Sequence, residues 1–294
     1  MILEHPATFD TVAMDPELKK MIIDDLETFV GRRKFYKKVG KAWKRGYLLY
    51  DPPGTGKSSL IAAMANYLKF DIYDLEHASI YSNSDLRNVL LSTTNRSILV
   101  IEDIDCSIQV QDRQNHLESD LSNKRLTLSG ILNFIDGLWS SCLDEKIIVL
   151  TTNHKDRLGP ALLRPGRMDV HINLSYCTVD AFRILASNYL DISNRDHPLF
   201  GEIESLIQST EVTPAEVAEE LMRSEDADLA LQGLVNFLKH KSKCDETEEE
   251  VAEIEETNSL KSDNEEKEIS VKRKRRRGIR IATRRRRGKG GTKD

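Results

Sequence analysis

The chain has 294 residues, of which 43 are Lys or Arg and 48 are Asp or Glu, for a formal net charge of −5. This length is enough for one large domain or two ordinary ones, each with a stable core. The four cysteines, at positions 106, 142, 177 and 244, form no C-x-x-C pair. Their spacing excludes a disulfide-dense scaffold, argues against a structural zinc site and favours an intracellular protein. The apolar runs are too short to predict a membrane span, and residues 1–6 do not resemble a signal peptide.

Five short runs rich in β-branched or aromatic residues predict buried strands, and helix-length segments separate the first three. The expected strands are 45–50, 70–75, 98–101, 147–151 and 170–174, and the expected helices between them are 58–68 and 84–93. Alternating strands and helices are typical of a parallel, doubly wound sheet whose ligand lies beyond the carboxyl ends of the strands. We therefore expect an α/β fold with a parallel five-stranded sheet flanked by helices.

After residue 176 the pattern predicts helices only, at 179–190, 201–209 and 214–222, the last one capped by Thr213. The polar stretch 107–124 interrupts the alternation and predicts a surface insertion. We therefore expect three parts: a large α/β subdomain over residues 1–176, a small helical lid subdomain over 177–243 and a tail over 244–294.

The tail is polarised in charge. Residues 245–270 carry a net charge of −10 and residues 271–294 a net charge of +12, with nine apolar side chains and no aromatic across both. So few apolar groups cannot offset the entropy of ordering, which predicts a disordered tail. Its Lys/Arg clusters are also compatible with a nuclear localisation signal or a nucleic-acid arm. The lack of aromatics and the adjacent acidic block argue against nucleic acid.

The strongest motif is Asp51-Pro-Pro-Gly-Thr-Gly-Lys-Ser58, which follows a strand and opens a helix. Gly54 and Gly56 allow the backbone to wrap a phosphate, Lys57 reaches the β- and γ-phosphates, and Ser58 offers a hydroxyl to Mg²⁺. The motif predicts an α/β P-loop NTPase that binds ATP and Mg²⁺. The expected nucleotide-binding residues of the loop are Pro53, Gly54, Thr55, Gly56, Lys57, Ser58 and Ser59.

Asp51 stands where the phosphate-loop pattern has glycine. Because Pro52 follows, residue 51 is expected in an extended conformation that Asp can adopt. The carboxylate remains a problem of charge: at about 8 Å from a phosphate charge it repels by roughly 2 kcal/mol at an effective dielectric near 20. Weakened nucleotide binding is therefore one alternative.

Two acids and one amide follow neighbouring strands. Glu102 and Asp103 come directly after the run 98–101, and Asn153 follows the run 147–151. Adjacent side chains on a strand point to opposite sides, so one acid is expected to serve the metal and the other the attacking water. An amide at Asn153 can orient that water, and Arg164 and Arg167, in a Pro-Gly turn, can stabilise phosphoryl charge. The alternative interpretations are an ordinary loop asparagine and arginines in surface ion pairs.

Taken in order, these blocks resemble those of the AAA ATPases. The runs 5–10, 40–50 and 162–169 are similar to one branch, the plant AAA ATPases related to the mitochondrial assembly ATPase that moves the Rieske protein. The resemblance covers residues 5–243. It implies a ring oligomer, usually a hexamer, that hydrolyses ATP at subunit interfaces and remodels or translocates a protein substrate.

The resemblance also assigns roles. Glu102 falls on the metal position and Asp103 on the base, an inversion of the wider family's Asp-Glu order that this branch shares. Asn153 falls on the first sensor, and Arg164 and Arg167 on the arginine fingers that act in trans. Val12 and Ala13 lie where relatives contact adenine through the backbone.

Two further positions depart from the family pattern. Gly159 stands where an aspartate is usual, and Tyr81 lies near the central-pore loop but lacks the glycine of the substrate-gripping pattern, having Ser82 instead. We therefore expect that Tyr81 does not grip substrate.

Relatives in this branch carry an N-terminal membrane anchor, which favours a mitochondrial or endoplasmic-reticulum membrane, although the chain begins almost at the ATPase module. Two other classes of function remain open: a hydrolysis-impaired nucleotide-binding scaffold that assembles with intact paralogues, because of Asp51, and a nucleic-acid-associated protein through the basic tail.

Overall fold

The structure, a computed structural model, describes residues 5–75, 88, 92–104, 145–192 and 197–243. The polar stretch 107–124, Tyr81, the tail 244–294 and most of the expected helix 84–93 therefore lie outside the described residues. The chain divides into two compact units, Met1–Leu238 and Lys239–Asp294. In the described part of the chain, none of the helices has the length and apolarity needed to span a bilayer.

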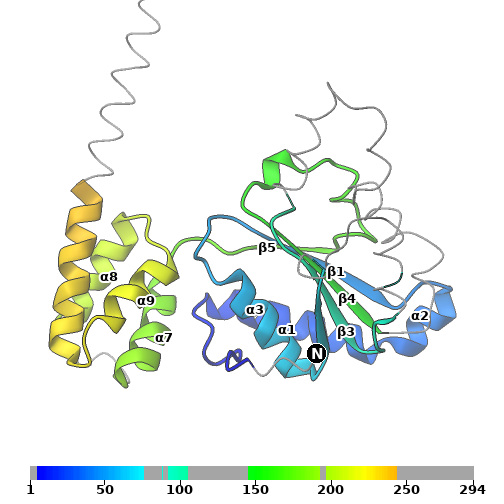
Figure 1. The fold of residues 1–294 in the computed structure, drawn as a ribbon, viewed down its shortest axis with the longest axis horizontal. Helices are drawn as coiled ribbons and strands as arrows, with labels where there is room; N and C mark the ends of the chain where they lie inside the picture. The colour runs from blue at the N-terminus through cyan, green and yellow to red at the C-terminus, as the bar shows by residue number, and fades with distance from the viewer. Residues whose placement is uncertain (1–4, 76–87, 89–91, 105–144, 193–196, 244–294) are drawn as a thin grey trace, which may run out of the picture. The chain divides into compact units, whose positions relative to one another are not determined.

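A five-stranded parallel sheet forms the centre of the first unit (Figure 1). The strands are β1 (Lys44–Tyr50), β2 (Asp71–Asp74), β3 (Ser97–Ile101), β4 (Lys146–Thr152) and β5 (Val170–Asn173), in the order β2-β3-β4-β1-β5. The predicted parallel five-stranded sheet is confirmed. Because β4 lies between β1 and β3, the segments that follow these three strands meet at one edge of the sheet.

One face of the sheet packs against α1 (Pro16–Gly31) and α3 (Lys57–Leu68) (Figure 1). Ile22 and Leu26 of α1 and Leu60 of α3 are fully buried against Tyr47 of β1 in this core. The sequence analysis did not predict α1 or the short α2 (Arg33–Val39).

The opposite face carries a second apolar cluster. Leu48, Leu99 and Leu150 point to this face because alternate residues of a strand face opposite sides. They pack with Leu162 and Met168 from the segment between β4 and β5, which begins with the 3₁₀ turn η3 (Lys155–Arg157). The segment that carries both predicted arginines is thus fixed by the core of the sheet.

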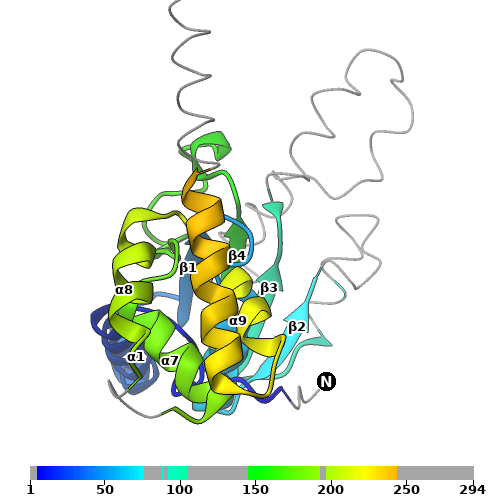
Figure 2. The ribbon, with the colours of Figure 1, turned by 90° about the vertical axis from the view of Figure 1, so that its left-hand side faces the viewer.

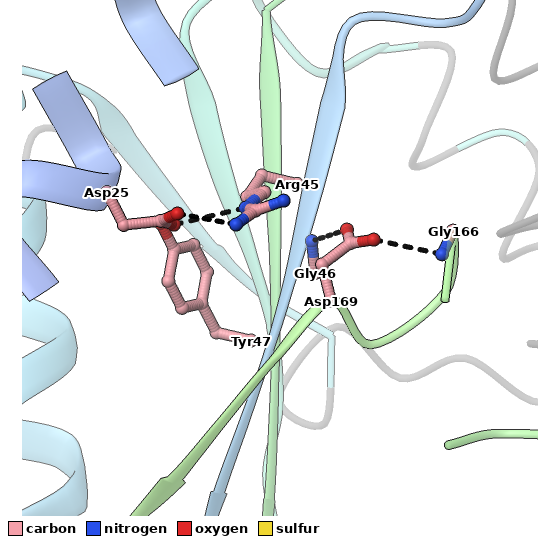
Figure 3. A network of polar contacts seen from close by, with 6 residues as sticks. All are labelled: Asp25, Arg45, Gly46, Tyr47, Gly166 and Asp169. Atoms are coloured by element: carbon pink, nitrogen blue, oxygen red, sulfur yellow. Dashed lines mark hydrogen bonds and ion pairs between the residues drawn. The ribbon is translucent and has the colours of Figure 1, made fainter. Parts of the chain in front are cut away.

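A polar network ties α1 to the start of β1 (Figure 3). The guanidinium of Arg45 donates to both carboxylate oxygens of Asp25, and the Tyr47 hydroxyl donates to the same carboxylate at 2.6 Å. The pKa of Tyr47 is raised, chiefly by burial and secondly by this hydrogen bond, which keeps the phenol protonated as a donor. The network fixes the strand that leads into the phosphate loop.

The lid subdomain contains α7 (Val179–Leu190), α8 (Phe200–Ser209), α9 (Pro214–Met222) and a further helix that begins at residue 227 (Figure 2). Phe182, Ile203, Val217 and Leu234, one from each helix, are fully buried in a shared core. Thr213 caps α9 in a reciprocal capping box with Glu216, as its position before Pro214 predicts.

Candidate nucleotide-binding site

The predicted phosphate loop connects β1 to α3. Gly54 has φ 80° and Gly56 has φ 92°, values that glycine adopts without strain, and they let the loop turn tightly before α3 begins at Lys57. The buried Thr55 hydroxyl donates to the carbonyl of Pro52 at 3.0 Å, which closes the loop on itself. α3 begins directly after this loop, and a helix N-terminus, whose first backbone N–H groups have no intrahelical acceptor, is suited to bind phosphate.

The expected conformation of Asp51 is wrong. Pro52 was expected to hold residue 51 in an extended conformation, but Asp51 has φ 103°, a region that favours glycine. The register of the loop imposes this angle, because β1 is paired with β4 and β5 up to Tyr50 and the chain must turn at the next residue. Asp51 therefore introduces backbone strain in addition to a negative charge.

Glu102 and Asp103 reach the same site, but not by strand alternation. β3 ends at Ile101, and Asp103 has φ 46°, so the premise that both acids lie on a strand is wrong. The Asp103 N–H donates to the Thr151 hydroxyl of β4 at 3.0 Å, which fixes this left-handed turn. Glu102 accepts a hydrogen bond from the Ser58 hydroxyl of α3 at 3.1 Å. Both carboxylates therefore lie beside the phosphate loop.

Asn153 connects the lysine of the loop to the second acid. Lys57 Nζ lies 2.8 Å from Asn153 Oδ1, and Asn153 Nδ2 lies 3.3 Å from Asp103 Oδ1. The same ammonium donates to the carbonyls of Asp51 and Pro52 at 2.6 and 3.0 Å. Three segments that are far apart in sequence thus place one cation, one amide and one carboxylate within hydrogen-bonding reach.

A single cavity of about 970 Å³ contains these groups. It is lined by every predicted site residue except the two arginines: Val12, Ala13, Pro53, Gly54, Thr55, Gly56, Lys57, Ser58, Ser59, Glu102, Asp103 and Asn153. The volume is at the upper end of the range for small-molecule sites and is adequate for a nucleoside triphosphate.

The lid supplies the opposite wall, which the sequence analysis missed. Leu185, Asn188 and Tyr189 lie at helical spacing on α7 and line the cavity. The Asn188 amide donates to the Thr11 carbonyl at 2.9 Å, next to Val12. The i, i+3, i+4 spacing was visible in the sequence, but it is equally typical of a buried core face.

The lid also touches the phosphate loop directly. The N–H of Ala215, in the first turn of α9, donates to the Gly54 carbonyl at 3.1 Å. A Cβ at Gly54 would lie 3.2 Å from both Ala215 Cβ and Thr213 Oγ1. The phosphate loop and the lid are therefore in close contact at this glycine.

The two predicted arginines differ in their surroundings. Arg164 is exposed, whereas Arg167 is 8% exposed and donates to the Ala161 carbonyl at 2.5 Å. Neither lines the cavity of its own chain. Of the two, only Arg164 is therefore exposed at the surface, and the role of both in a neighbouring site stays a prediction.

The donor set fits both groups that the motif implies. A hydroxyl and a carboxylate 3.1 Å apart, Ser58 and Glu102, offer the oxygen ligands that Mg²⁺ prefers. Lys57 and the first turn of α3 offer positive charge and N–H donors to phosphate. Among the described residues there is no cluster of three or more His, Cys, Asp or Glu that could hold a metal ion.

Two family models match consecutive parts of the chain. Residues 47–176 match the ATPase family associated with various cellular activities (AAA), and residues 177–251 match the At3g28540-like AAA+ ATPase lid domain.

Similar full-length proteins come from Arabidopsis thaliana. The chain is 68% identical to AAA-ATPase At2g18193 over 252 residues, which cover 85% of this chain and 51% of that protein. It is 64% identical to AAA-ATPase At3g50940, over 83% of this chain and 54% of that protein. It is 56% identical to Protein HYPER-SENSITIVITY-RELATED 4, over 92% of this chain and 48% of that protein. The chain thus spans about half the length of the curated relatives it matches.

Proposed function

Because the chain belongs to the AAA ATPase family, we propose that it binds Mg²⁺–ATP in the cavity between the sheet and the lid and hydrolyses it. The observation that carries this proposal is the contact chain from Lys57 through Asn153 to Asp103. It places a phosphate-binding cation beside an amide and a carboxylate, which are the groups that hydrolysis of a γ-phosphate needs.

Each residue has a defined task in this proposal. Lys57 holds the β- and γ-phosphates, and the N–H groups from Gly54 to Ser58 surround them. Ser58 and Glu102 would hold Mg²⁺, which would supply positive charge to the β- and γ-phosphates. Asp103 accepts the proton of the attacking water, which Asn153 orients. The oxygen of that water forms a bond to the γ-phosphorus as the bond to ADP oxygen breaks.

The nucleobase fits at the other end of the cavity. Val12 and Ala13 offer backbone groups, and Asn188 holds the adjacent Thr11 carbonyl. Ala13 also packs against the apolar core of the lid, so this segment bridges sheet and lid. Adenine bound here would connect both walls of the cavity and couple nucleotide binding to the position of the lid.

We further infer that the chain works as a ring, hexameric or mixed with paralogues, in which Arg164 acts on the site of the neighbouring subunit. Its exposure outside its own cavity supports this arrangement. Remodelling of a protein substrate, and kinship with the assembly ATPase of the Rieske protein, belong to the same proposal.

A second candidate function is a nucleotide-binding scaffold with impaired hydrolysis. The observation that favours it is Asp51, which combines φ 103° with a carboxylate at the phosphate loop. The two candidates differ in turnover, not in binding.

Release of inorganic phosphate from ATP by the purified chain tests the main proposal. We expect turnover that needs Mg²⁺, disappears with a chelator and rises per subunit as protein concentration increases. ATP binding in calorimetry without phosphate release would support the scaffold instead. Absence of both binding and release would overturn both candidates.

A further inference from the structure

Arg164 and Arg167 are the first and last residues of one tight turn. The Arg167 N–H donates to the Arg164 carbonyl at 3.1 Å. Pro165 occupies the second position of the turn, and Gly166, with φ 88°, occupies the third. This is the pattern of a type II turn, in which proline fixes the entry angle and glycine supplies the positive φ. The residues at the two central positions of the turn that carries the exposed Arg164 therefore suit this turn type.

Asp169 fastens this turn to β1 (Figure 3). One carboxylate oxygen accepts from the Gly166 N–H at 2.9 Å, and the other accepts from the Gly46 N–H at 3.0 Å. The Asp169 N–H donates to the Gly46 carbonyl at 2.8 Å. The side chain thus joins the turn to β1 one residue before β5 begins at Val170.

The turn and β1 are also in close steric contact. A Cβ on Gly46 would lie 1.7 Å from the carbonyl oxygen of Arg167, so only glycine allows this approach. On the same strand, Arg45 and Tyr47 are fixed by Asp25 of α1, which leaves β1 little freedom to move away. β1 then leads directly into the phosphate loop at Asp51. One strand therefore supports both the phosphate loop and the arginine turn.

We propose that Asp169 is a positioning residue for Arg164: it holds the arginine turn against β1 so that Arg164 reaches the ATP site of the neighbouring subunit. The inference rests on the proposed function, because it needs hydrolysis in a ring.

The first test is Asp169→Asn, which keeps the size of the side chain and one oxygen acceptor but loses the second. We expect kcat to fall about ten-fold or more, since a misplacement of about 1 Å costs up to about 100-fold, while KM for ATP changes less than about two-fold. Asp24→Asn, an exposed acid on α1, is the matched control and should change neither parameter.

A second variant perturbs the turn without touching β1. A Cβ on Gly166 meets nothing within 4 Å, so Gly166→Ala acts through the φ of 88° alone. We expect the same fall in kcat with little change in KM. A normal kcat in both Asp169→Asn and Gly166→Ala would overturn the inference.

Mixed rings separate positioning from loss of structure. A Lys57→Ala subunit has no functional phosphate loop but keeps its arginine turn, so it should restore hydrolysis by Asp169→Asn subunits, whose own sites are intact. The double variant Lys57→Ala/Asp169→Asn should fail to restore it. Equal restoration by both partners would overturn the inference, because the turn would then be dispensable in trans.

Amide hydrogen exchange provides a readout that does not depend on hydrolysis. In Asp169→Asn, exchange should quicken at Gly46 or Gly166 and stay unchanged at buried β4 amides. Unchanged exchange at both glycines would overturn the inference. Absence of hydrolysis in the wild type would instead overturn the proposed function, so the two failures are distinguishable.

Discussion

The ammonium of Lys57 and the amide oxygen of Asn153 are 2.8 Å apart, although 96 positions separate them in the sequence. The contact joins the phosphate loop after β1 to the end of β4. A bound γ-phosphate would share the Lys57 ammonium with Asn153 and lie next to Asp103, which accepts from the same amide. In the proposed function, binding and hydrolysis therefore depend on different members of one contact chain, which single substitutions can separate.

Lys57→Ala should abolish ATP binding. The substitution removes the only side-chain cation that lines the described cavity beside the phosphate loop, and a neutral stem cannot replace that charge among the phosphates. Titration calorimetry with Mg²⁺–ATP measures the loss, with Lys20→Ala, an exposed lysine on α1, as the control. Unchanged affinity would contradict the assignment of the phosphate loop.

Asp103→Asn should bind ATP as the wild type does but hydrolyse it at least about 100-fold more slowly, because it removes the proton acceptor and keeps the phosphate contacts. Glu102→Gln, the matched variant, should chiefly raise the Mg²⁺ concentration needed for half-maximal turnover, since Glu102 contacts Ser58. Phosphate release measured against Mg²⁺ concentration distinguishes them. If Asp103→Asn instead raised the Mg²⁺ requirement and Glu102→Gln slowed hydrolysis, Asp103 would be the metal ligand and Glu102 the proton acceptor.

Much of the sheet and of the phosphate end of the site was predictable, because the signals are local. The apolar runs of β3 and β4 and the Gly-Lys-Ser sequence of the loop each specify their own structure. Since parallel strands end at a common edge, the proximity of Asp103 and Asn153 also followed from order along the chain.

The remainder depends on tertiary contacts. The φ of 103° at Asp51 arises from strand pairing on both sides of β1, which overrides the preference that Pro52 imposes. The burial of Arg167 depends on how the segment that joins β4 to β5 packs on the sheet, and the cavity wall of α7 depends on how the lid packs against residues 11–13. No periodicity in the sequence distinguishes the turn with the buried Arg167 from an exposed turn, or α7 from an ordinary core helix.

Arg164→Ala and Arg167→Ala should give different phenotypes. Arg164 is exposed, so its loss should lower turnover without changing the urea midpoint. Arg167 is buried and donates to Ala161, so its loss should also lower the free energy of unfolding, by about 1–3 kcal/mol, because the hydrogen bond from a charged, buried donor is lost. Urea unfolding and phosphate release on the same samples test this. Equal destabilisation by both variants would contradict the assigned difference.

Gly54→Ala and Gly56→Ala form a matched pair on the phosphate loop. Both residues have positive φ, so both variants should weaken ATP binding through strain. At Gly56 a Cβ meets nothing within 4 Å, whereas at Gly54 it meets Ala215 and Thr213 at 3.2 Å. Only Gly54→Ala should therefore quicken hydrogen exchange at the Ala215 amide. The same exchange in both variants would show that the loop does not hold the lid at this point.

Asp51 combines two separable effects, and two substitutions resolve them. Asp51→Gly removes both the carboxylate and the strain of φ 103°. Relief of this strain stabilises the folded state, and the extra freedom of glycine in the unfolded chain cancels part of the gain. The free energy of unfolding should therefore rise by about 1 kcal/mol. Asp51→Asn removes the charge but keeps the Cβ, so its stability should stay close to that of the wild type.

The same pair separates the effects on nucleotide affinity. Without the repulsion, Asp51→Asn should bind ATP about five-fold to thirty-fold more tightly, and its advantage over the wild type should shrink as salt concentration rises. Asp51→Gly should bind at least as tightly and keep part of its advantage at high salt, because relief of backbone strain is not screened. Calorimetry at two salt concentrations measures both. Suppose that Asp51→Asn had the ATP affinity of the wild type and only Asp51→Gly bound ATP more tightly. Backbone strain alone would then account for the effect of Asp51, and the electrostatic contribution would be excluded.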